Sequence, residues 1–311
     1  MHVLGIDAGG TKTVCLLADE HGHVLAEGRG GGANLHTSGE LEVEKVLHHV
    51  MEAAIGDRDI TPAAVCLGIA GVDREDEART VRTIMRRIGY KTRTVVVNDA
   101  LIALVAGAGN EPGIVIIAGT GSIVYGRNAR HEAARAGGWG HIIGDEVSGY
   151  WIGREALAAV MRAVDGRGPA TRLTDDVLAH FSIADTSQLP RIVYDREVPR
   201  MSVAALGPLV QRASELGDAV ATRILERAAD ELVLAARSVA TRLEMRGDAF
   251  DFVLAGGVFP VVPWVGYEVA KRLMEVAPRS QVRLLEQEPA VGAVCLALAE
   301  ARGALTIPKY K

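Results

Sequence analysis

Two short glycine-containing turns follow apolar segments of the chain, and both have the residue types that bind phosphate. The first is Asp7-Ala8-Gly9-Gly10-Thr11-Lys12, after residues 3–6, and the second is Gly119-Thr120-Gly121-Ser122, after residues 114–117. Because glycine has no Cβ, backbone N–H groups in such a turn can approach phosphate oxygens closely. Two turns of this kind predict a nucleotide held between two related halves of the chain.

The first turn also has a carboxylate at the end of its apolar segment. We expect Asp7 to hold Mg²⁺, through water, while Gly9, Gly10 and Thr11 donate hydrogen bonds to the β- and γ-phosphates. The alternative is an ordinary turn with aspartate at its first position, and the second turn favours the nucleotide site. Lys12 is placed at the same site, with a solvated strand residue as its alternative. The cofactor-binding residues expected in the second turn are Gly119, Thr120, Gly121 and Ser122.

Asp99 follows the apolar segment 95–97 and Asn98. One interpretation makes it the N-cap of a helix that starts at residue 100, because aspartate is a preferred cap. The other makes it the base that accepts a proton from an attacking hydroxyl group, since phosphoryl transfer needs mainly positioning and charge neutralisation. Both can hold, because ligands of open α/β sheets bind at the carboxyl ends of the strands.

Residues 137–148 form a segment with four glycines around Trp139 that ends in adjacent acids. Ordering such a segment costs conformational entropy, which favours a functional loop. We predict that Gly138, Trp139 and Gly140 contact substrate and that Asp145 or Glu146 hydrogen-bonds sugar hydroxyl groups. In the alternative, Trp139 fills a hydrophobic gap, and Ser148 or Glu146 caps the following helix.

Two further polar or glycine positions have a functional and a structural interpretation. Asn34, after the glycines at 30–32, is either a turn residue or a polar contact to the substrate. Gly256 and Gly257 follow the apolar segment 252–255 and let a flat ring or a ribose lie against the backbone, which predicts the adenosine site. Their alternative is a tight strand-to-helix turn.

Hydrophobic periodicity predicts the elements that position these residues. The first half has expected strands at 2–7, 13–18 and 24–28 with a hairpin turn at 20–23, a helix at 40–55, a strand at 64–70, a helix at 75–88, a strand at 94–97 and a helix at 100–106. The second half has expected strands at 114–117 and 123–127, a helical insertion from about 148 to 246, a strand at 252–255, a helix at 261–276, a strand at 281–285 and a helix at 290–301.

The repeated element order predicts an α/β protein made of a duplicated domain, βββαβαβα in each copy, with mainly parallel sheets covered on both faces. The expected domains are residues 1–112 and 113–311, with the helical insertion in the second. A last helix at 290–302 is expected to pack back on the N-terminal lobe.

Composition narrows the classes of partner. A chain of 311 residues is long enough for two domains, and its net charge of −5 gives no basic face for nucleic acid. No apolar segment is long enough to span a bilayer. Cys15, Cys66 and Cys295 lie far apart in apolar segments, which is typical of buried free thiols in a reducing compartment, so a cytoplasmic location is expected.

The ordered set of motifs resembles the N-acetylglucosamine kinase branch of the sugar kinase, Hsp70 and actin superfamily, which is grouped by sequence with the BadF/BcrA-type ATPases. The resemblance spans nearly the whole chain and depends on residues 7–13, 97–100, 119–122, 137–148, 255–257 and 288–293. It implies duplicated actin-like, ribonuclease H-like ATPase domains that close around ATP and a sugar, and a homodimer.

The activity that the resemblance implies is ATP- and Mg²⁺-dependent phosphorylation of the 6-hydroxyl of an amino sugar, N-acetylglucosamine first, with glucosamine and muramic-type sugars as alternatives. Asp99 would be the base, with Asn34, Asp145 and residues 138–140 at the hexosamine. Thr11 and Thr120 would contact the ATP phosphates. Ala204, by a looser match, would line the adenosine site with Gly256 and Gly257.

The chain departs from this family pattern at two places. Leu35 stands where some animal relatives have histidine, and residues 171–200 have no convincing match, which leaves the substrate range open.

Other function classes make demands that this sequence does not meet. Activator ATPases of the same group need clustered cysteines for an iron–sulfur cluster, and zinc-containing sugar kinases need a Cys-rich ligand set. A non-catalytic sensor has no need for Asp7 and Asp99 together.

Overall fold

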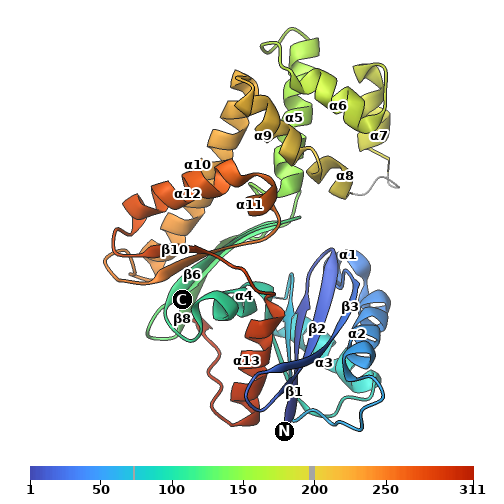
Figure 1. Ribbon diagram of the computed structural model, residues 1–311, viewed down its shortest axis with the longest axis vertical. Coiled ribbons are helices and arrows are strands. Elements are labelled where there is room, and N and C mark those ends of the chain that lie inside the picture. Colours follow the sequence, from blue (N-terminus) through green and yellow to red (C-terminus); the bar gives the residue numbers. More distant parts are fainter. Residues whose placement is uncertain (73, 196–199) are drawn as a thin grey trace. The chain divides into compact units, whose positions relative to one another are not determined.

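A computed structural model of the chain (Figure 1) describes residues 1–72, 74–195 and 200–311, so residues 196–199 of the unmatched segment 171–200 lie outside the described residues. The chain separates into two compact units. The first unit contains residues 1–115, 125–134 and 283–311, and the second contains residues 116–124 and 135–282.

The first unit is built on a five-stranded sheet in the order β3-β2-β1-β4-β5. Its strands are β1 (His2–Ala8), β2 (Lys12–Asp19), β3 (Val24–Gly31), β4 (Ala64–Ile69) and β5 (Arg93–Asn98). β2 is antiparallel to β1 and to β3, whereas β1, β4 and β5 are parallel, so the sheet is mixed and not mainly parallel. The register aligns Ala8 with Ile69 and Ile69 with Asn98. The carboxyl ends of these three strands therefore meet at one edge.

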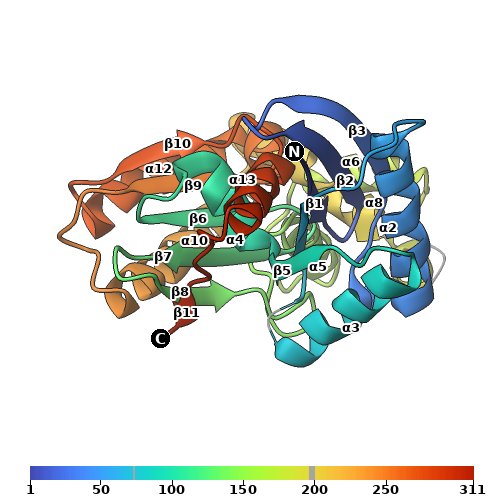
Figure 2. The ribbon, with the colours of Figure 1, turned by 90° about the horizontal axis from the view of Figure 1, so that it is seen from below.

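Helices cover both faces of this sheet (Figure 2), with α2 and α3 on one side and α4 and α13 on the other. The helices of the first unit are α1 (Leu35–Ser38), α2 (Glu40–Ile55), α3 (Glu75–Arg87), α4 (Asp99–Ala108) and α13 (Ala290–Ala301). α2 buries one stripe that includes Val43, Leu47 and Val50, as its periodicity predicts. α4 is buried continuously over residues 100–106, because it is apolar on all sides.

α13 comes from the end of the chain and packs with almost no room to spare. A Cβ on Gly5 of β1 would lie 2.4 Å from the backbone nitrogen of Val294, and a Cβ on Gly292 would lie 1.9 Å from the carbonyl oxygen of Ile102 in α4. No real Cβ fits at such distances, so glycine at both positions lets the backbones of β1, α4 and α13 meet. The final helix is thus part of the core of the first unit.

The second sheet repeats the topology of the first. Its order is β10-β9-β6-β7-β8-β11, and without β11 the order β8-β7-β6-β9-β10 matches β3-β2-β1-β4-β5 strand for strand. The strands are β6 (Gly113–Ala118), β7 (Ser122–Arg127), β8 (Glu132–Gly137), β9 (Asp251–Ala255), β10 (Gln281–Leu284) and β11 (Lys309–Tyr310). This repetition establishes the duplicated domain. β8 and β11 were not among the strands predicted from the sequence.

The second unit contains most of the helices, in the segment where the insertion was predicted. They are α5 (Gly149–Val164), α6 (Leu173–Phe181), the short 3₁₀ helix Thr186–Gln188, α7 (Leu189–Val193), α8 (Arg200–Ala204), α9 (Gly207–Glu215) and α10 (Ala219–Arg242), followed by α11 (Val258–Val261) and α12 (Pro263–Val276). Asp218 begins α10: its carboxylate accepts hydrogen bonds from the N–H groups of Val220 at 2.8 Å and Ala221 at 3.0 Å. It also accepts from Arg172 N–H at 2.7 Å and from the Thr171 hydroxyl at 2.9 Å, which links α10 to the start of α6.

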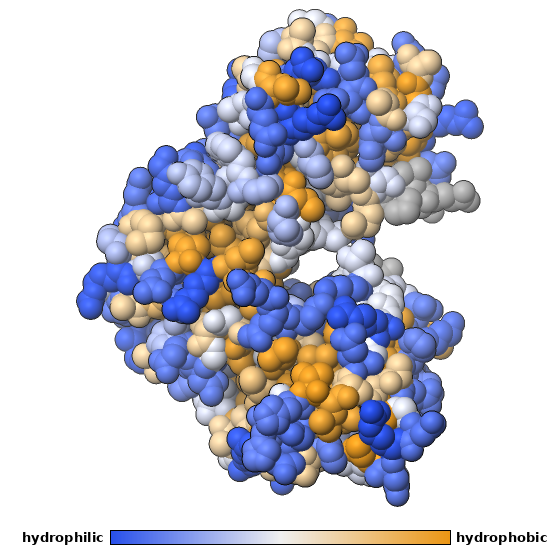
Figure 3. Space-filling model, viewed as in Figure 1, coloured by the Kyte–Doolittle hydropathy of each residue, from blue (hydrophilic) through white to orange (hydrophobic). Residues whose placement is uncertain are grey.

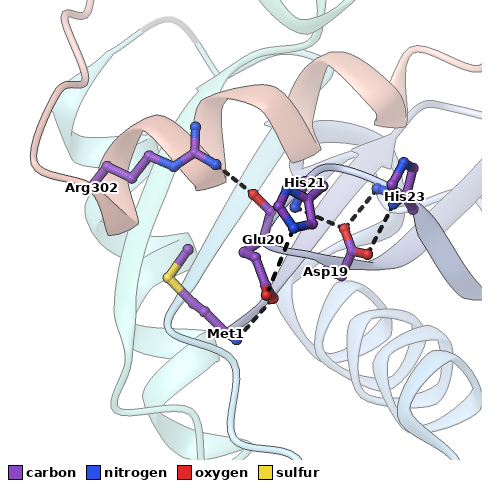
Figure 4. A network of polar contacts seen from close by, with 6 residues as sticks. All are labelled: Met1, Asp19, Glu20, His21, His23 and Arg302. Atoms are coloured by element: carbon purple, nitrogen blue, oxygen red, sulfur yellow. Dashed lines mark hydrogen bonds and ion pairs between the residues drawn. The ribbon is translucent and has the colours of Figure 1, made fainter.

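The hairpin predicted at residues 20–23 joins β2 to β3 (Figure 4). Asp19 accepts hydrogen bonds from the N–H groups of His21 at 2.8 Å and His23 at 2.9 Å, and the amino group of Met1 pairs with Glu20 at 3.1 Å. Slight desolvation raises the pKa of Asp19, but these N–H groups and the His23 ring outweigh it and lower the pKa to about 2. The turn is therefore held by its own carboxylate.

Cys15 and Cys66 are buried free thiols, as expected, but Cys295 is exposed and the prediction for it was wrong. Cys295 is an exposed position of α13 between the buried residues Val294 and Leu296. On the face seen in Figure 3, hydrophilic residues surround smaller hydrophobic patches. Among the described residues, no helix combines the length and the apolar character that crossing a membrane requires.

Candidate active site

The first glycine turn connects β1 to β2 and is closed by backbone hydrogen bonds. Gly9 N–H donates to the carbonyl of Lys12 at 3.0 Å, and Ala33 N–H donates to the carbonyl of Gly9 at 3.0 Å. The second bond ties the turn to the segment after β3, which places Asn34 beside it. The backbone carbonyl of Asn34 accepts from Ser38 N–H at 2.9 Å, so Asn34 serves the α1 turn. Its contact to a substrate stays a prediction.

The backbone of Gly10 faces open space. Its φ is not in the left-handed region, and a Cβ at this position would meet nothing within 4 Å. Neither backbone strain nor packing therefore requires glycine here. The same two observations hold for Gly119 in the second turn and for Gly257 after β9. All three positions leave space beside Cα through which phosphate or ribose can approach the backbone, although the N–H of Gly119 is itself bonded to the carbonyl of Gly121.

Asp7 lies at the carboxyl edge of the first sheet, opposite Gly68 of β4, and only 9% of it is exposed. Burial raises the pKa of its carboxyl to about 7, helped by the nearby charge of Asp99 and, less, of Glu288, while Lys12 opposes the shift. Carboxylates that repel one another in this way form a place where a divalent cation would be stabilised. Within the described residues, however, no three Asp, Glu, His or Cys side chains gather as a metal site, so the Mg²⁺ ion expected at Asp7 stays a prediction.

Asp99 is the first residue of α4 and is half-buried. The N-cap of the helix is Asn98, whose side-chain oxygen accepts from Ala100 N–H at 2.8 Å. The prediction that Asp99 caps this helix was wrong, because the preceding asparagine does so. Asp99 thus remains a candidate base, on the same sheet edge as Asp7.

Lys12 is the first residue of β2, and its ammonium group is paired 2.8 Å from Glu288 Oε2, although 58% of the side chain is exposed. It is therefore more than a solvated strand residue. The second oxygen of Glu288 accepts from Arg29 of β3 at 3.1 Å. Burial raises the pKa of Glu288, but Lys12 and Arg29 outweigh it and leave the pKa below its usual value.

The second glycine turn, between β6 and β7, is held by hydrogen bonds of backbone and hydroxyl groups. Gly119 N–H donates to the carbonyl of Gly121 at 2.8 Å, and Gly149 N–H, at the start of α5, donates to the carbonyl of Gly119 at 2.8 Å. The Ser122 hydroxyl donates to the carbonyl of Glu146 at 2.5 Å. The turn is thereby joined to the segment 137–148 that was predicted to bind substrate.

Asp145 lies against this turn: a Cβ on Gly121 would be 2.9 Å from its Oδ2. Burial raises the pKa of Asp145, while hydrogen bonds from the backbone of Ser122 and Gly140 oppose the shift. Asp145 and the fully buried Val147 have φ values of 55° and 73°, which non-glycine residues rarely adopt. Such strain persists only where the surroundings impose it, and it gathers at binding sites.

Trp139 does not fill a hydrophobic gap, because 57% of it is exposed. The guanidinium of Arg135 lies 4.4 Å from its ring centroid, which orients the indole by a cation–π contact. Gly138, with φ of 72°, lets the loop turn next to Ile123. The expected structural role of Ser148 is confirmed, since its hydroxyl accepts from Trp151 N–H at 3.1 Å and caps α5.

Two of the predicted adenosine residues, Gly256 and Ala204, lie near the second glycine turn. Gly256 has φ of 102°, and a Cβ there would be 2.4 Å from the carbonyl oxygen of Ala118, so the tight strand-to-helix turn requires this glycine. Ala204, the last residue of α8, has its Cβ only 3.2 Å from where a Cβ on Gly149 would stand. Gly149 is bonded to Gly119, so α8 and the second turn belong to one local cluster.

The structure thus collects the predicted residues into two sets, each within one unit. The first unit holds Asp7, Gly9, Gly10, Thr11, Lys12, Asn34 and Asp99. The second holds Gly119, Thr120, Gly121, Ser122, Gly138, Trp139, Gly140, Asp145, Glu146, Ala204, Gly256 and Gly257. Sequence reasoning assigned no role to Glu288, although the motif that begins with it was noticed. A carboxylate directly before Pro289 and a helix was the available signal.

The repeated strand order and the glycine turn after the first strand of each sheet define a duplicated, actin-like ATPase fold of the ribonuclease H-like kind. The chain belongs to the BadF/BadG/BcrA/BcrD ATPase family, whose model matches residues 4–297.

Similar proteins include two curated sugar kinases. The N-acetylmuramic acid/N-acetylglucosamine kinase of Clostridium acetobutylicum is 37% identical over 96% of this chain and 99% of the relative. The N-acetyl-D-glucosamine kinase of Dictyostelium discoideum is 33% identical over 95% and 97% of the two chains. Among solved structures, a candidate N-acetylglucosamine kinase from Chromobacterium violaceum aligns with a TM-score of 0.78 at 26% identity, over 96% of this chain and 98% of the other.

Proposed function

We propose that this protein is an ATP-dependent kinase that phosphorylates the 6-hydroxyl of an amino sugar, with N-acetylglucosamine as the first candidate and N-acetylmuramic acid and glucosamine as alternatives. The observation that carries the proposal is the strand register that puts Asp7 and Asp99 on one sheet edge, close enough to interact, while Asn98 takes the capping role. Family membership and two relatives that act on N-acetylated amino sugars support it.

In this proposal Asp99 accepts the proton of the sugar hydroxyl as its oxygen attacks the γ-phosphorus. The bond from the γ-phosphorus to the β–γ bridging oxygen breaks, and ADP leaves with that oxygen. Asp7 would hold Mg²⁺ through water, and the ion would neutralise charge on the phosphates. The phosphate oxygens would lie beside Gly10 and Gly119, where no Cβ stands in the way, and would contact the hydroxyl residues Thr11 and Thr120.

The sugar would be bound by Asn34 and by residues 138–146, where Trp139 presents an exposed ring and Asp145 a carboxylate. Aromatic faces and carboxylates suit a sugar, which has apolar C–H faces and hydroxyl donors. The adenosine would lie at Ala204, Gly256 and Gly257. We further propose a cytoplasmic homodimer, which size-exclusion chromatography with light scattering tests directly.

The test is an ADP-release assay on purified protein with MgATP and a panel of sugars: N-acetylglucosamine, N-acetylmuramic acid, glucosamine, N-acetylmannosamine and glucose. We expect turnover that depends on an amino sugar, and a 6-phosphate product identified by ³¹P–¹H NMR. ATP hydrolysis that no sugar accelerates would contradict the kinase and favour an activator-type ATPase.

A further inference from the structure

Glu288 connects three parts of the first unit. Its Oε2 lies 2.8 Å from the Lys12 ammonium at the end of the first glycine turn, and its Oε1 lies 3.1 Å from the Arg29 guanidinium on β3. Each carboxylate oxygen therefore has its own cation. Only 30% of the Glu288 side chain is exposed, but the Lys12 and Arg29 side chains are 58% and 51% exposed, so water screens these pairs in part.

The backbone that presents Glu288 is itself fixed. Pro289 follows it and restricts φ, and α13 begins at Ala290. α13 packs closely on β1 and α4, because Gly5 and Gly292 allow backbone contact with no room for a Cβ. The carboxylate is thus presented from a rigid support.

The neighbouring residue reaches the helix of the candidate base. The side-chain amide of Gln287 donates to the carbonyl of Ala106, in the last turn of α4, where helix carbonyls have no partner within the helix. Asp99 is the first residue of the same helix. Gln287 therefore contacts the helix that carries Asp99. The next residue, Glu288, contacts Lys12 at the end of the first glycine turn.

Lys12 and Glu288 also act electrostatically on Asp7, the proposed metal-binding acid. Lys12 favours the ionised form of Asp7 and Glu288 opposes it, so both lie within electrostatic reach of the same carboxyl. An ammonium group in this place is suited to a phosphate oxygen, provided that its flexible stem is held there. Ordering the Lys12 side chain costs conformational entropy. Because the ion pair with Glu288 already orders it, this cost is not incurred when the nucleotide binds.

We propose that Glu288 is a positioning residue that holds the Lys12 ammonium beside the first glycine turn, ready to bind a phosphate oxygen of ATP, while Gln287 keeps the helix of Asp99 in register with that turn. This inference depends on ATP binding at the first turn, which is part of the proposed function, but not on the identity of the acceptor sugar.

The test compares Glu288→Gln with Glu27→Gln. Glu27 is another carboxylate paired with Arg29, at 3.1 Å, and it is the matched control because its ion pair is made with Arg29 and not with Lys12. We expect Glu288→Gln to weaken MgATP binding, measured by isothermal titration calorimetry, by about tenfold, since a hydrogen bond to a charged group contributes about that much. It should raise the KM for ATP equally and leave the KM for the sugar unchanged. Glu27→Gln should change none of these constants.

A double-mutant cycle separates positioning from general destabilisation. Lys12→Met should lose as much ATP affinity as Glu288→Gln, and the double variant should lose no more than Lys12→Met alone. Additive losses, or equal losses in Glu288→Gln and Glu27→Gln, would overturn the inference. Where Glu288→Gln does not fold, Glu288→Asp keeps the charge and should stay within about threefold of the wild type in ATP affinity; a full tenfold loss in that variant would count against Lys12 positioning.

The assay also separates this inference from the proposed function. Wild-type protein that binds MgATP but phosphorylates no sugar would refute the kinase and leave the role of Glu288 testable by calorimetry. Wild-type protein that binds no MgATP would refute both.

Discussion

The two glycine turns occupy the same place in two sheets of identical strand order, yet their surroundings differ in kind. The first turn is surrounded by charged side chains that act on one another: Asp7, Lys12 and Glu288. The second is held by hydrogen bonds from Gly149 N–H and the Ser122 hydroxyl. Duplication therefore kept the backbone of the turn, whereas the Lys12–Glu288 ion pair stands beside the first turn and the Asp145 carboxylate beside the second.

The two glycine turns differ in side-chain chemistry at two corresponding positions. Asp7 stands two residues before Gly9, and Ile117 stands two residues before Gly119. Lys12 opens β2, and Ser122 opens β7. The carboxylate and the ammonium group of the first copy thus correspond to an apolar residue and a hydroxyl group in the second. We infer that the first turn serves the reacting phosphate and the metal, while the second binds nucleotide without taking part in the chemistry.

The largest effect on activity is expected from a substitution of Asp99, the proposed general base. Asp99→Asn should lower kcat by about 10²- to 10⁴-fold, because an amide cannot accept the proton of the attacking hydroxyl. The affinity for MgATP, measured by calorimetry, should stay within about threefold of the wild type. Turnover near the wild-type rate would remove Asp99 from its role and leave the first unit without a base.

Substituting Asp7, the proposed metal-binding acid, tests the difference between the turns directly. Asp7→Asn should raise the Mg²⁺ concentration needed for half-maximal activity by about 10- to 100-fold, because a group that orients metal-bound water is lost. Ser122→Ala, the matched change in the second turn, removes only a neutral hydrogen bond to Glu146 and should leave the Mg²⁺ requirement unchanged. An equal rise in both variants would show that the two turns share the metal, against our comparison.

Substitutions of two glycines in the second unit separate an effect on ATP binding from an effect on stability. Gly256→Ala should lower the free energy of unfolding by about 2 kcal/mol, since φ of 102° and the Ala118 carbonyl leave no place for a Cβ. Gly119→Ala should leave thermal stability unchanged, because nothing lies within 4 Å of its Cβ, and weaken ATP binding by about tenfold. Thermal denaturation and calorimetry on both variants measure the two quantities. An unaltered ATP affinity in Gly119→Ala would mean that no ligand approaches this backbone.

The smallest effect on activity is expected in the helical part of the second unit. Asp218→Ala removes the N-cap of α10 and the bonds to Thr171 and Arg172, and should cost about 2 kcal/mol of stability with little change in kcat. Burial raises the pKa of Asp218, but its N–H partners outweigh it and lower the pKa below the ordinary value. The stabilisation is therefore complete above about pH 4 and is lost as the pH falls below it. Urea unfolding of wild type and variant should accordingly converge in acid; a difference that persists there would contradict this account.

Much of the fold was predictable because its elements are long or strongly patterned. The strands that contain Val3–Ile6 and Val95–Val97 are continuous apolar segments, and α2 has a clear helical stripe. β8 was missed because its sequence, Glu-Ala-Ala-Arg-Ala-Gly, has no β-branched or aromatic residue, and only its neighbours in the sheet make it a strand. β11 is two residues long and has no pattern at all.

The candidate site was predictable where local chemistry sufficed and not where distant segments meet. The glycine turns and Asp99 are recognisable from the adjacent strands, but the choice between Asn98 and Asp99 as cap depended on side-chain geometry. The pairing of Lys12 with Glu288 joins residues 276 positions apart, which no local pattern reveals. The left-handed conformation of Val147 also could not be foreseen, because β-branched residues resist it.

The placement of α13 has a consequence for biosynthesis. The helix α13, which packs on β1, is synthesised after every strand of the N-terminal sheet. Until then, β1 keeps an apolar surface with no cover, and Asp7 sits on an unfinished support. The core of the first unit can therefore be completed only after α13 has been synthesised.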